Sequence, residues 1–592
     1  MPLKRFGAIV HVLILTAGVV FAQSPVTLSI NTQTPGYAIP DDFSGISLEM
    51  GALKSGNSGT PGYMFDDTTV FPAPSHKQVL TLFLQLGLKH VRVGGGSVDQ
   101  NIVPANADID AFFRFVKLAG VKVAYSVRLL NGNITDDTNI VKYVWSNYQQ
   151  YIDCFSIGNE PDFHSYHNSD PEIFEATSGV TGSAYPSYVA KWNRFAAAIT
   201  TAVPDAKLSG PDTGSNYPAS GGTNTSYNGK TWTANFAADE SSSGFVKSVY
   251  FHNYVGQSAS GSNQLMIDNM LSTTWVSSNY PTLYNASGAT ATSDGLLFRL
   301  TESNSYSGAV KGASNSFATA LFALDYMHWW AEHGAEGVNF HNKQWVGNGP
   351  IYIDGNLSYQ VYPVGYGIKA FDLGGHGSVG TTTITNPDGL NLTAYAVQDT
   401  GSLYVTVINK EHNAGARAAT VTISAEGFSR NAKVVFLKSP TGVFDTSGVT
   451  LGGAPITNSG PWQGVWQPID SVRSGNCYIT VPASTAAVVK IDAGVTSVPK
   501  ETLQPDQYEL FQNYPNPFNP STVITYRLPA ASQVRIKIFD ALGREVSDLI
   551  DQRQTAGEHS VTFNAQGFGS GVYFCRFMAG SYNATMKMVL LK

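Results

Sequence analysis

Two glutamates, each at the end of an apolar run, are the residues best suited to do chemistry in this chain. Glu160 closes the stretch CFSIGNE, between Asn159 and Pro161, and Glu302 lies within RLTESNS. Hydrolysis of a glycosidic bond needs two carboxyl groups, one to protonate the leaving oxygen and one, ionised, to attack the anomeric carbon. The pair suggests glycoside hydrolysis if the fold brings the two residues together. If the fold does not bring them together, the two glutamates are unrelated loop residues.

The elements that carry these glutamates alternate in type. Between residues 43 and 375, eight short apolar runs are separated by amphipathic stretches with helical spacing. The expected strands are residues 43–50, 90–97, 122–130, 154–160, 207–212, 246–254, 296–304 and 337–342. Eight strands alternating with helices predict an α/β fold, a (β/α)8 TIM barrel, over residues 43–375.

Polar residues follow the expected barrel strands, where a barrel enzyme carries its active site. They are Glu49, Ser97, Arg128, Glu160, Asp212, Tyr254, Glu302 and His341. Strand ends are polar in any case because loops begin there, which accounts for serine and aspartate better than for two glutamates. Placed at strands four and seven, Glu160 and Glu302 would face each other across the barrel mouth.

The pattern changes to period two after residue 376. Residues 376–493 predict an antiparallel β-sandwich appended to the barrel, and the N-terminal segment 23–42 is expected to add a strand to it. Residues 494–507 lack periodicity and predict a linker. Residues 508–592 predict a small separate β-sandwich domain.

Composition limits the other functions. The chain has 592 residues, of which 13% are charged, and its net charge of −7 includes no run of Lys or Arg. Nucleic acid and an anionic membrane are therefore not expected partners. Residues 1–22 predict a signal peptide, and no later stretch is long enough to span a membrane. Three cysteines predict no disulfide framework, and no Cys/His pattern indicates a metal or cofactor.

The C-terminal segment resembles a known export signal. Residues 508–592 contain NYPNPFNP, IFDALGREV, GVYF and a terminal KMVLLK, and they resemble the C-terminal sorting domain of the type IX secretion system. The resemblance implies a protein that is secreted or displayed at the cell surface, with the type IX machinery as a partner. A carbohydrate-binding module is the alternative for this segment.

Residues 26–493 resemble glycoside hydrolase family 79, which contains β-glucuronidases and heparanase. The matching pieces are FSGISLEMGAL, HVRVGGGSVDQN, SIGNEPD, VYFHNYVG, TESNS and NSFATALFALDYM with GVNFHN. The resemblance implies a retaining mechanism with Glu160 as acid/base and Glu302 as nucleophile. It also implies that Asn159 contacts the sugar 2-hydroxyl and that Tyr254 hydrogen-bonds the nucleophile.

Further residues are expected to bind the sugar. Glu49 and His252 fall at barrel-mouth positions, although His252 is equally explained as a buried, hydrogen-bonded histidine. In the family, a tyrosine and consecutive glycines after the nucleophile bind the uronate carboxylate. Here Tyr306 and Gly308 have a shifted spacing in a broken glycine run, and Tyr352 matches a second carboxylate-binding tyrosine loosely.

The expectation from sequence is a secreted retaining β-glucuronidase that acts on an oligosaccharide or polysaccharide containing uronic acid. One alternative is a retaining glycosidase of the same clan that acts on a neutral sugar such as an arabinofuranoside, xyloside or glucoside. The other is a non-catalytic surface protein that binds carbohydrate. The two glutamates, with Asn159 and Tyr254, favour an enzyme over a binding protein.

Overall fold

A computed structural model gives the fold. It describes residues 25–54, 64–65, 75–100, 102–163, 169–174, 184–214, 226–256, 261–343, 347–354, 358–469, 472–473, 476–493, 508–580 and 582–591. The expected signal peptide (1–22) and linker (494–507) lie outside these residues. The chain divides into two compact units at residues 494 and 495. None of the described helices is long and apolar enough to cross a membrane.

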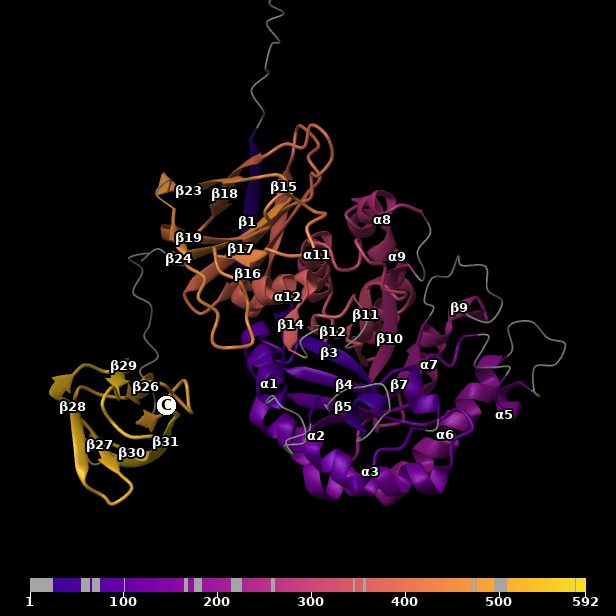
Figure 1. The fold of residues 1–592 in the computed structure, drawn as a ribbon, viewed down its shortest axis with the longest axis horizontal. Helices are drawn as coiled ribbons and strands as arrows, with labels where there is room; N and C mark the ends of the chain where they lie inside the picture. The colour runs from indigo at the N-terminus through magenta and orange to yellow at the C-terminus, as the bar shows by residue number, and fades with distance from the viewer. Residues whose placement is uncertain are drawn as a thin grey trace, which may run out of the picture. The chain divides into compact units, whose positions relative to one another are not determined.

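Eight parallel strands form a closed barrel in the first unit (Figure 1), which confirms the predicted TIM barrel. In chain order they are β3 (Ser44–Glu49), β4 (His90–Gly94), β5 (Lys122–Val127), β6 (Ile152–Ile157), β7 (Leu208–Thr213), β10 (Val246–Gly256), β11 (Leu297–Tyr306) and β12 (Val338–His341). Every expected strand overlaps one of these. The strands are almost wholly buried because helices cover the outside and side chains fill the inside.

Helices alternate with the barrel strands. They are α1 (Ser75–Leu86), α2 (Asn106–Ala119), α3 (Ile134–Tyr148), α5 (Pro171–Phe174), α6 (Ala184–Ala202), α7 (Trp232–Glu240), α8 (Asn263–Met270), α9 (Tyr280–Ala286), α10 (Gly288–Ser293), α11 (Ala318–Glu332) and α12 (Pro363–Gly374). Glycines follow the first two helices, since Gly87 and Gly120 come directly after α1 and α2 with φ of 70° and 64°. Asn133 caps α3 by accepting from the backbone N–H groups of Thr135 and Asp136.

Shorter elements complete the barrel. They are the single-turn helices η1 (Met50–Leu53), η2 (Gly96–Gln100) and η3 (Gln149–Tyr151), the π-helical turn η5 (Trp275–Asn279), and the hairpins β8 (Ser226–Tyr227) with β9 (Lys230–Thr231) and β13 (Ile351–Ile353) with β14 (Tyr359–Val361). The β13–β14 hairpin follows the last barrel strand. Asn342 anchors it, because the Asn342 side-chain oxygen accepts from the backbone N–H of Ile351 at 2.8 Å.

A β-sandwich belongs to the same unit. Its strands are β1 (Val26–Asn31), β2 (Ala38–Ile39), β15 (Gly377–Thr385), β16 (Leu392–Asp399), β17 (Ser402–Asn409), β18 (Ala419–Ala425), β19 (Phe428–Lys438), β20 (Thr450–Leu451), β21 (Gln467–Pro468), β22 (Val472–Arg473), β23 (Asn476–Val481) and β24 (Thr485–Ala493). Strand β1 pairs antiparallel with β15 and parallel with β18, so the N-terminal segment does add a strand. Leu28, Val405, Val421 and Val489 share the apolar core.

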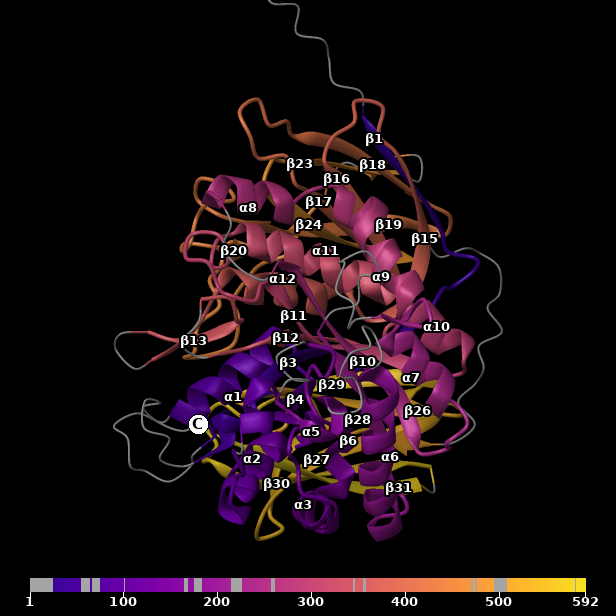
Figure 2. The ribbon, with the colours of Figure 1, turned by 90° about the vertical axis from the view of Figure 1, so that its right-hand side faces the viewer.

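Helices α11 and α12 lie between the barrel strands and the sandwich in both views (Figures 1 and 2). A buried ion pair crosses this contact, with the Lys410 ammonium 2.6 Å from an Asp325 oxygen on α11. The Tyr395 hydroxyl donates to the other Asp325 oxygen at 2.7 Å. The carboxylate is thus fully engaged, as a buried charge requires. The sandwich therefore packs against the barrel through helices α11 and α12.

The second unit is a smaller sandwich. Its strands are β25 (Glu509–Leu510), β26 (Ser521–Leu528), β27 (Ser532–Asp540), β28 (Glu545–Gln554), β29 (Gly557–Asn564), β30 (Gly571–Ala579) and β31 (Tyr582–Leu590). They form a three-stranded sheet, β25-β26-β29, and a four-stranded sheet, β28-β27-β30-β31, with an apolar core of their own. Throughout the chain Cys154, Cys477 and Cys575 are free, buried thiols.

Candidate active site

The turn that carries Glu160 follows barrel strand β6. The strand ends at Ile157, three residues earlier than the sequence indicates, because Gly158 and Glu160 both adopt positive φ, 89° and 48°. A left-handed conformation costs a non-glycine residue about 1–2 kcal/mol. A backbone hydrogen bond of 2.9 Å from Glu160 to the Asp212 carbonyl holds the turn in place. Strain of this kind concentrates at functional sites and points to a role for the side chain.

Glu302 lies within barrel strand β11 and is 8% exposed. Its two oxygens accept from different donors, Oε1 from the Tyr254 hydroxyl and Oε2 from the Arg92 guanidinium, each at 2.8 Å. Burial raises the pKa of Glu302, but electrostatic attraction to His341, His252 and Arg92 outweighs burial and holds that pKa well below its usual range. Glu302 is therefore an ionised carboxylate.

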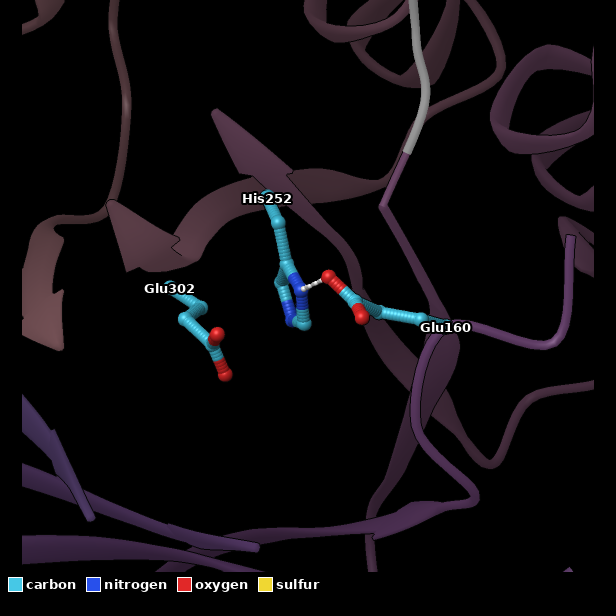
Figure 3. A group of neighbouring side chains, drawn as sticks. All are labelled: Glu160, His252 and Glu302. Carbon is cyan, nitrogen blue, oxygen red and sulfur yellow. Dashed lines mark hydrogen bonds and ion pairs between the residues drawn. The ribbon is translucent and has the colours of Figure 1, made fainter. Parts of the chain in front are cut away.

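His252 lies between the two glutamates on strand β10 (Figure 3). Its Nδ1 is 2.9 Å from Glu160 Oε1, and its Nε2 is 3.3 Å from Asp212 Oδ1. One oxygen of Glu160, one oxygen of Glu302 and one His252 nitrogen all lie within 4.8 Å of one another. Burial lowers the pKa of His252, but Glu302, Asp212 and Glu160 raise it more, to about 10. His252 is thus an imidazolium with a carboxyl group at each nitrogen.

This arrangement predicts how stability depends on pH. The pKa of His252 is higher in the folded protein, about 10, than its ordinary value of 6.5. Its contribution to stability is complete below pH 6.5 and is lost as pH rises from 6.5 toward 10. The expected slope is up to about 1.4 kcal/mol per pH unit. Urea unfolding of wild type and His252→Gln between pH 6 and 10 measures it: the free-energy difference between the two should shrink with pH, and a constant difference would contradict the assignment.

His252 is one of three neighbouring residues that have the side chains of metal ligands. Glu160, His252 and Glu302 have the composition of a small metal site. A histidine ligates a metal only when it is neutral, whereas His252 holds its proton because Glu302, Asp212 and Glu160 stabilise the charge. A cation would therefore have to displace that proton before His252 could ligate it.

Arg92, on strand β4, contacts three residues of the site: Glu302, Asn159 and Asp212. This fully buried guanidinium donates to Glu302 Oε2 and, at 2.7 Å, to the side-chain oxygen of Asn159, and it lies 3.5 Å from Asp212 Oδ2. Burial lowers the pKa of Arg92, but Asp212, Glu302 and Glu160 raise it more, so the charge is permanent. Arg92 fixes the spacing between strands β6 and β11, and with it the positions of Asn159 and Glu302.

Glu49 ends strand β3, which lies between β12 and β4 in the barrel. Its Oε2 accepts from the backbone N–H of Ser97 at 2.8 Å, and its Oε1 lies 2.9 Å from the Lys343 ammonium and 3.6 Å from His341. Gly95 approaches closely, since a Cβ there would lie 2.6 Å from Glu49 Oε2, and its φ is +60°. This explains why Gly95 follows strand β4: a side chain there would displace Glu49.

Two segments of the chain match known protein families. Residues 394–488, from strand β16 to β24, match the glycosyl hydrolase family 79 C-terminal beta domain. The chain is a glycoside hydrolase. Residues 512–591 match the secretion system C-terminal sorting domain, so the hydrolase is exported, as a secreted or cell-surface protein. Both matches confirm the resemblances found in the sequence.

Solved structures share the fold of the hydrolase, while no curated protein sequence matches it. A 4-O-α-L-rhamnosyl-β-D-glucuronidase from Fusarium oxysporum 12S is 19% identical, with 78% of this chain and 99% of that chain covered and a TM-score of 0.58. A family 51 arabinofuranosidase from Xanthomonas axonopodis pv. citri is 13% identical, with coverage of 79% and 100% and a TM-score of 0.58. At these identities the likeness shows the barrel-and-sandwich fold alone.

Three residues were expected to bind a uronate carboxylate: Tyr306, Gly308 and Tyr352. Among the described residues, each of the three has different surroundings. Tyr306 is 4% exposed, and its hydroxyl donates to the Met266 carbonyl at 3.0 Å and accepts from Asn269 at 3.2 Å, so its one proton is bound to helix α8. Gly308 is exposed in the turn after β11. Tyr352 is half-buried on β13, and its ring stacks on Tyr362 with centroids 3.8 Å apart.

Several site residues were not predicted. Asp212 and His341 were noted as strand ends without a role, and Arg92 and Lys343 were not noted. Asp212, fully buried, accepts from Thr301 at 2.5 Å and from the Ser156 hydroxyl. One signal for Arg92 was available, since HVRVG places a permanent charge inside an otherwise apolar strand, and a buried charge must have partners.

Proposed function

We propose that this hydrolase cleaves a β-linked uronic acid, most simply glucuronic acid at the non-reducing end of a glycan, with retention of configuration. The observation that carries the proposal is the closeness of Glu160 and Glu302, which present oxygens within 4.8 Å of each other from barrel strands four and seven. Carboxyl groups about 5–5.5 Å apart leave room for a covalent intermediate, whereas inverting enzymes need about 6.5–9.5 Å to admit a water.

The surroundings of the two carboxyl groups assign their roles. Glu302, ionised between Tyr254 and Arg92, attacks the anomeric carbon and forms a glycosyl ester. Glu160 gives a proton to the leaving oxygen as the glycosidic bond breaks. It then takes a proton from the water that hydrolyses the ester, which releases the sugar and restores Glu302. His252 Nδ1 lies 2.9 Å from Glu160 and holds a proton next to this carboxyl group during both steps.

The orientation of Asn159 supports binding of the sugar 2-hydroxyl. Arg92 occupies the side-chain oxygen of Asn159, so the amide nitrogen of Asn159 is the group left to donate. A donor beside the acid/base matches the role that the family resemblance implies. Hydrogen bonds to the 2-hydroxyl strengthen in the transition state, so this contact contributes to kcat as well as to binding.

Support for a uronic acid comes from the family 79 domain and from the match to a β-D-glucuronidase. Within the site, Tyr352 and the exposed turn at Gly308 are the proposed carboxylate contacts. Tyr306 does not support this role, because its proton is bound by Met266. The match to an arabinofuranosidase defines the competing substrate, a neutral sugar.

A panel of 4-nitrophenyl glycosides tests the proposal. We expect the β-glucuronide to be cleaved with a kcat/KM at least roughly tenfold above those of the β-glucoside, β-xyloside and α-L-arabinofuranoside, which corresponds to one charge-assisted hydrogen bond. Proton NMR of the first product should show the β-anomer. A faster arabinofuranoside would replace the uronate assignment, and an initial α-anomer would overturn retention.

A further inference from the structure

A row of two carboxylates, one histidine and one lysine leads from Glu302 outward to the barrel mouth. His341 lies 3.5 Å from Glu302 Oε2 and 3.6 Å from Glu49 Oε1, and the Lys343 ammonium lies 2.9 Å from the same Glu49 oxygen. Side-chain exposure is 10% at Glu302, 5% at His341, 21% at Glu49 and 45% at Lys343. Lys343 is thus the outermost member and the one most open to solvent.

The backbone around Lys343 is held in place. Strand β12 ends at His341, and Asn342 donates its backbone N–H to the Ser47 carbonyl at 2.8 Å and anchors Ile351 through its side chain. The ammonium group has three protons, of which the contact with Glu49 needs one. Burial lowers the pKa of Lys343, but Glu49 raises it more, so the charge persists. Lys343 therefore presents a fixed, partly free cation at the mouth.

A cation at this place would favour the binding of an acidic sugar. The sugar would approach the carboxyl groups of Glu49, Glu160 and Glu302, which repel an anion in a partly desolvated site. Arg92 cannot compensate by contact, because it is fully buried and bound to Glu302 and Asn159. The imidazolium of His252 is also buried and faces Glu160 and Asp212. Lys343 is the cation of this group that a ligand can reach.

We propose that Lys343 is a specificity-determining residue, which binds the anionic group of an acidic sugar while Glu49 holds its ammonium in position. The anion is a carboxylate at C6, as in a uronic acid, or a sulfate ester at the same place. This inference rests on the proposed glycosidase function and names the side chain that selects the charge. A lysine is a suitable partner for either anion because it acts as a point charge with rotatable donors.

The test compares three substrates with one leaving group: the 4-nitrophenyl β-glucuronide, β-glucoside and β-glucoside 6-sulfate. Lys343→Met should lower kcat/KM for the preferred anionic substrate by roughly 10- to 100-fold, the value of one charge-assisted hydrogen bond, and for the glucoside by far less. Lys343→Arg should recover part of the loss. Lys89→Met is the matched control, since Lys89 is exposed just before β4, at the opposite end of the barrel strands.

Each outcome decides a different point. A loss confined to the glucuronide assigns a uronate, and a loss confined to the sulfate assigns a sulfated sugar. An equal fall for all three substrates would overturn the inference, because Lys343 would then only hold Glu49. If wild type prefers the glucuronide and Lys343→Met keeps that preference, the inference fails while the proposed function stands. If wild type cleaves none of the three, the proposed function itself fails.

Discussion

Glu302→Gln is expected to reduce kcat by about 10⁵-fold or more, the scale seen when an enzyme loses its nucleophile. The amide is nearly isosteric with the carboxylate and keeps one acceptor oxygen for either Tyr254 or Arg92, but it cannot form the glycosyl ester. The measurement is the steady-state rate on an activated aryl β-glycoside. A variant that retains more than about 1% of the wild-type kcat would show that another group attacks the sugar.

The matched control for this substitution is Glu426→Gln. Glu426 is exposed in the turn between β18 and β19, and its backbone carbonyl accepts a hydrogen bond from Thr32. It should leave kcat and the thermal midpoint unchanged. Glu302→Gln should lower the thermal midpoint, because the amide loses the attraction to Arg92 and His252 that outweighs the repulsion from Glu49. Assays well below the unfolding transition of the variant therefore separate a loss of chemistry from a loss of folding.

The barrel and the acidic pair were predictable because both follow from local patterns. Buried parallel strands appear as continuous apolar runs, and a glutamate directly after such a run is placed by the strand itself. The contact from Tyr254 to Glu302 was implied by the family resemblance, and it agrees with the pairing of β10 and β11, whose registers bring the two residues to the same end. In these cases sequence position alone determines spatial position.

The network beneath the pair was not predictable in the same way. Arg92 joins strands β4, β6, β7 and β11, and its partners depend on side-chain directions inside the closed barrel. A shifted motif predicted that Tyr306 would bind a carboxylate. Instead its hydroxyl donates to helix α8, which lies in the chain between β10 and β11. The role of Lys343 depends on its contact with Glu49. Glu49 ends the first barrel strand, whereas Lys343 follows the last one. Such contacts depend on tertiary geometry.

Glu160→Ala is expected to lower kcat/KM by about 10²- to 10⁴-fold for substrates with poor leaving groups, which is the usual contribution of general acid–base catalysis. For a 2,4-dinitrophenyl glycoside, whose leaving group needs little protonation, the first step should be nearly unimpaired. The ester on Glu302 then accumulates, because no base activates water, and a rapid burst precedes slow turnover. Uniform loss across leaving groups would contradict the role of Glu160 as acid.

Azide distinguishes the two glutamates by the stereochemistry of its product. Glu160 is partly open to solvent, so its removal leaves room for a small anion on the face from which water attacks. With Glu160→Ala, azide should speed turnover and yield the β-glycosyl azide, because two inversions occur. With Glu302→Ala, azide replaces the nucleophile and a single inversion should yield the α-glycosyl azide. Exchanged products would reverse the roles, since each anomer records which carboxyl group still takes part in the reaction.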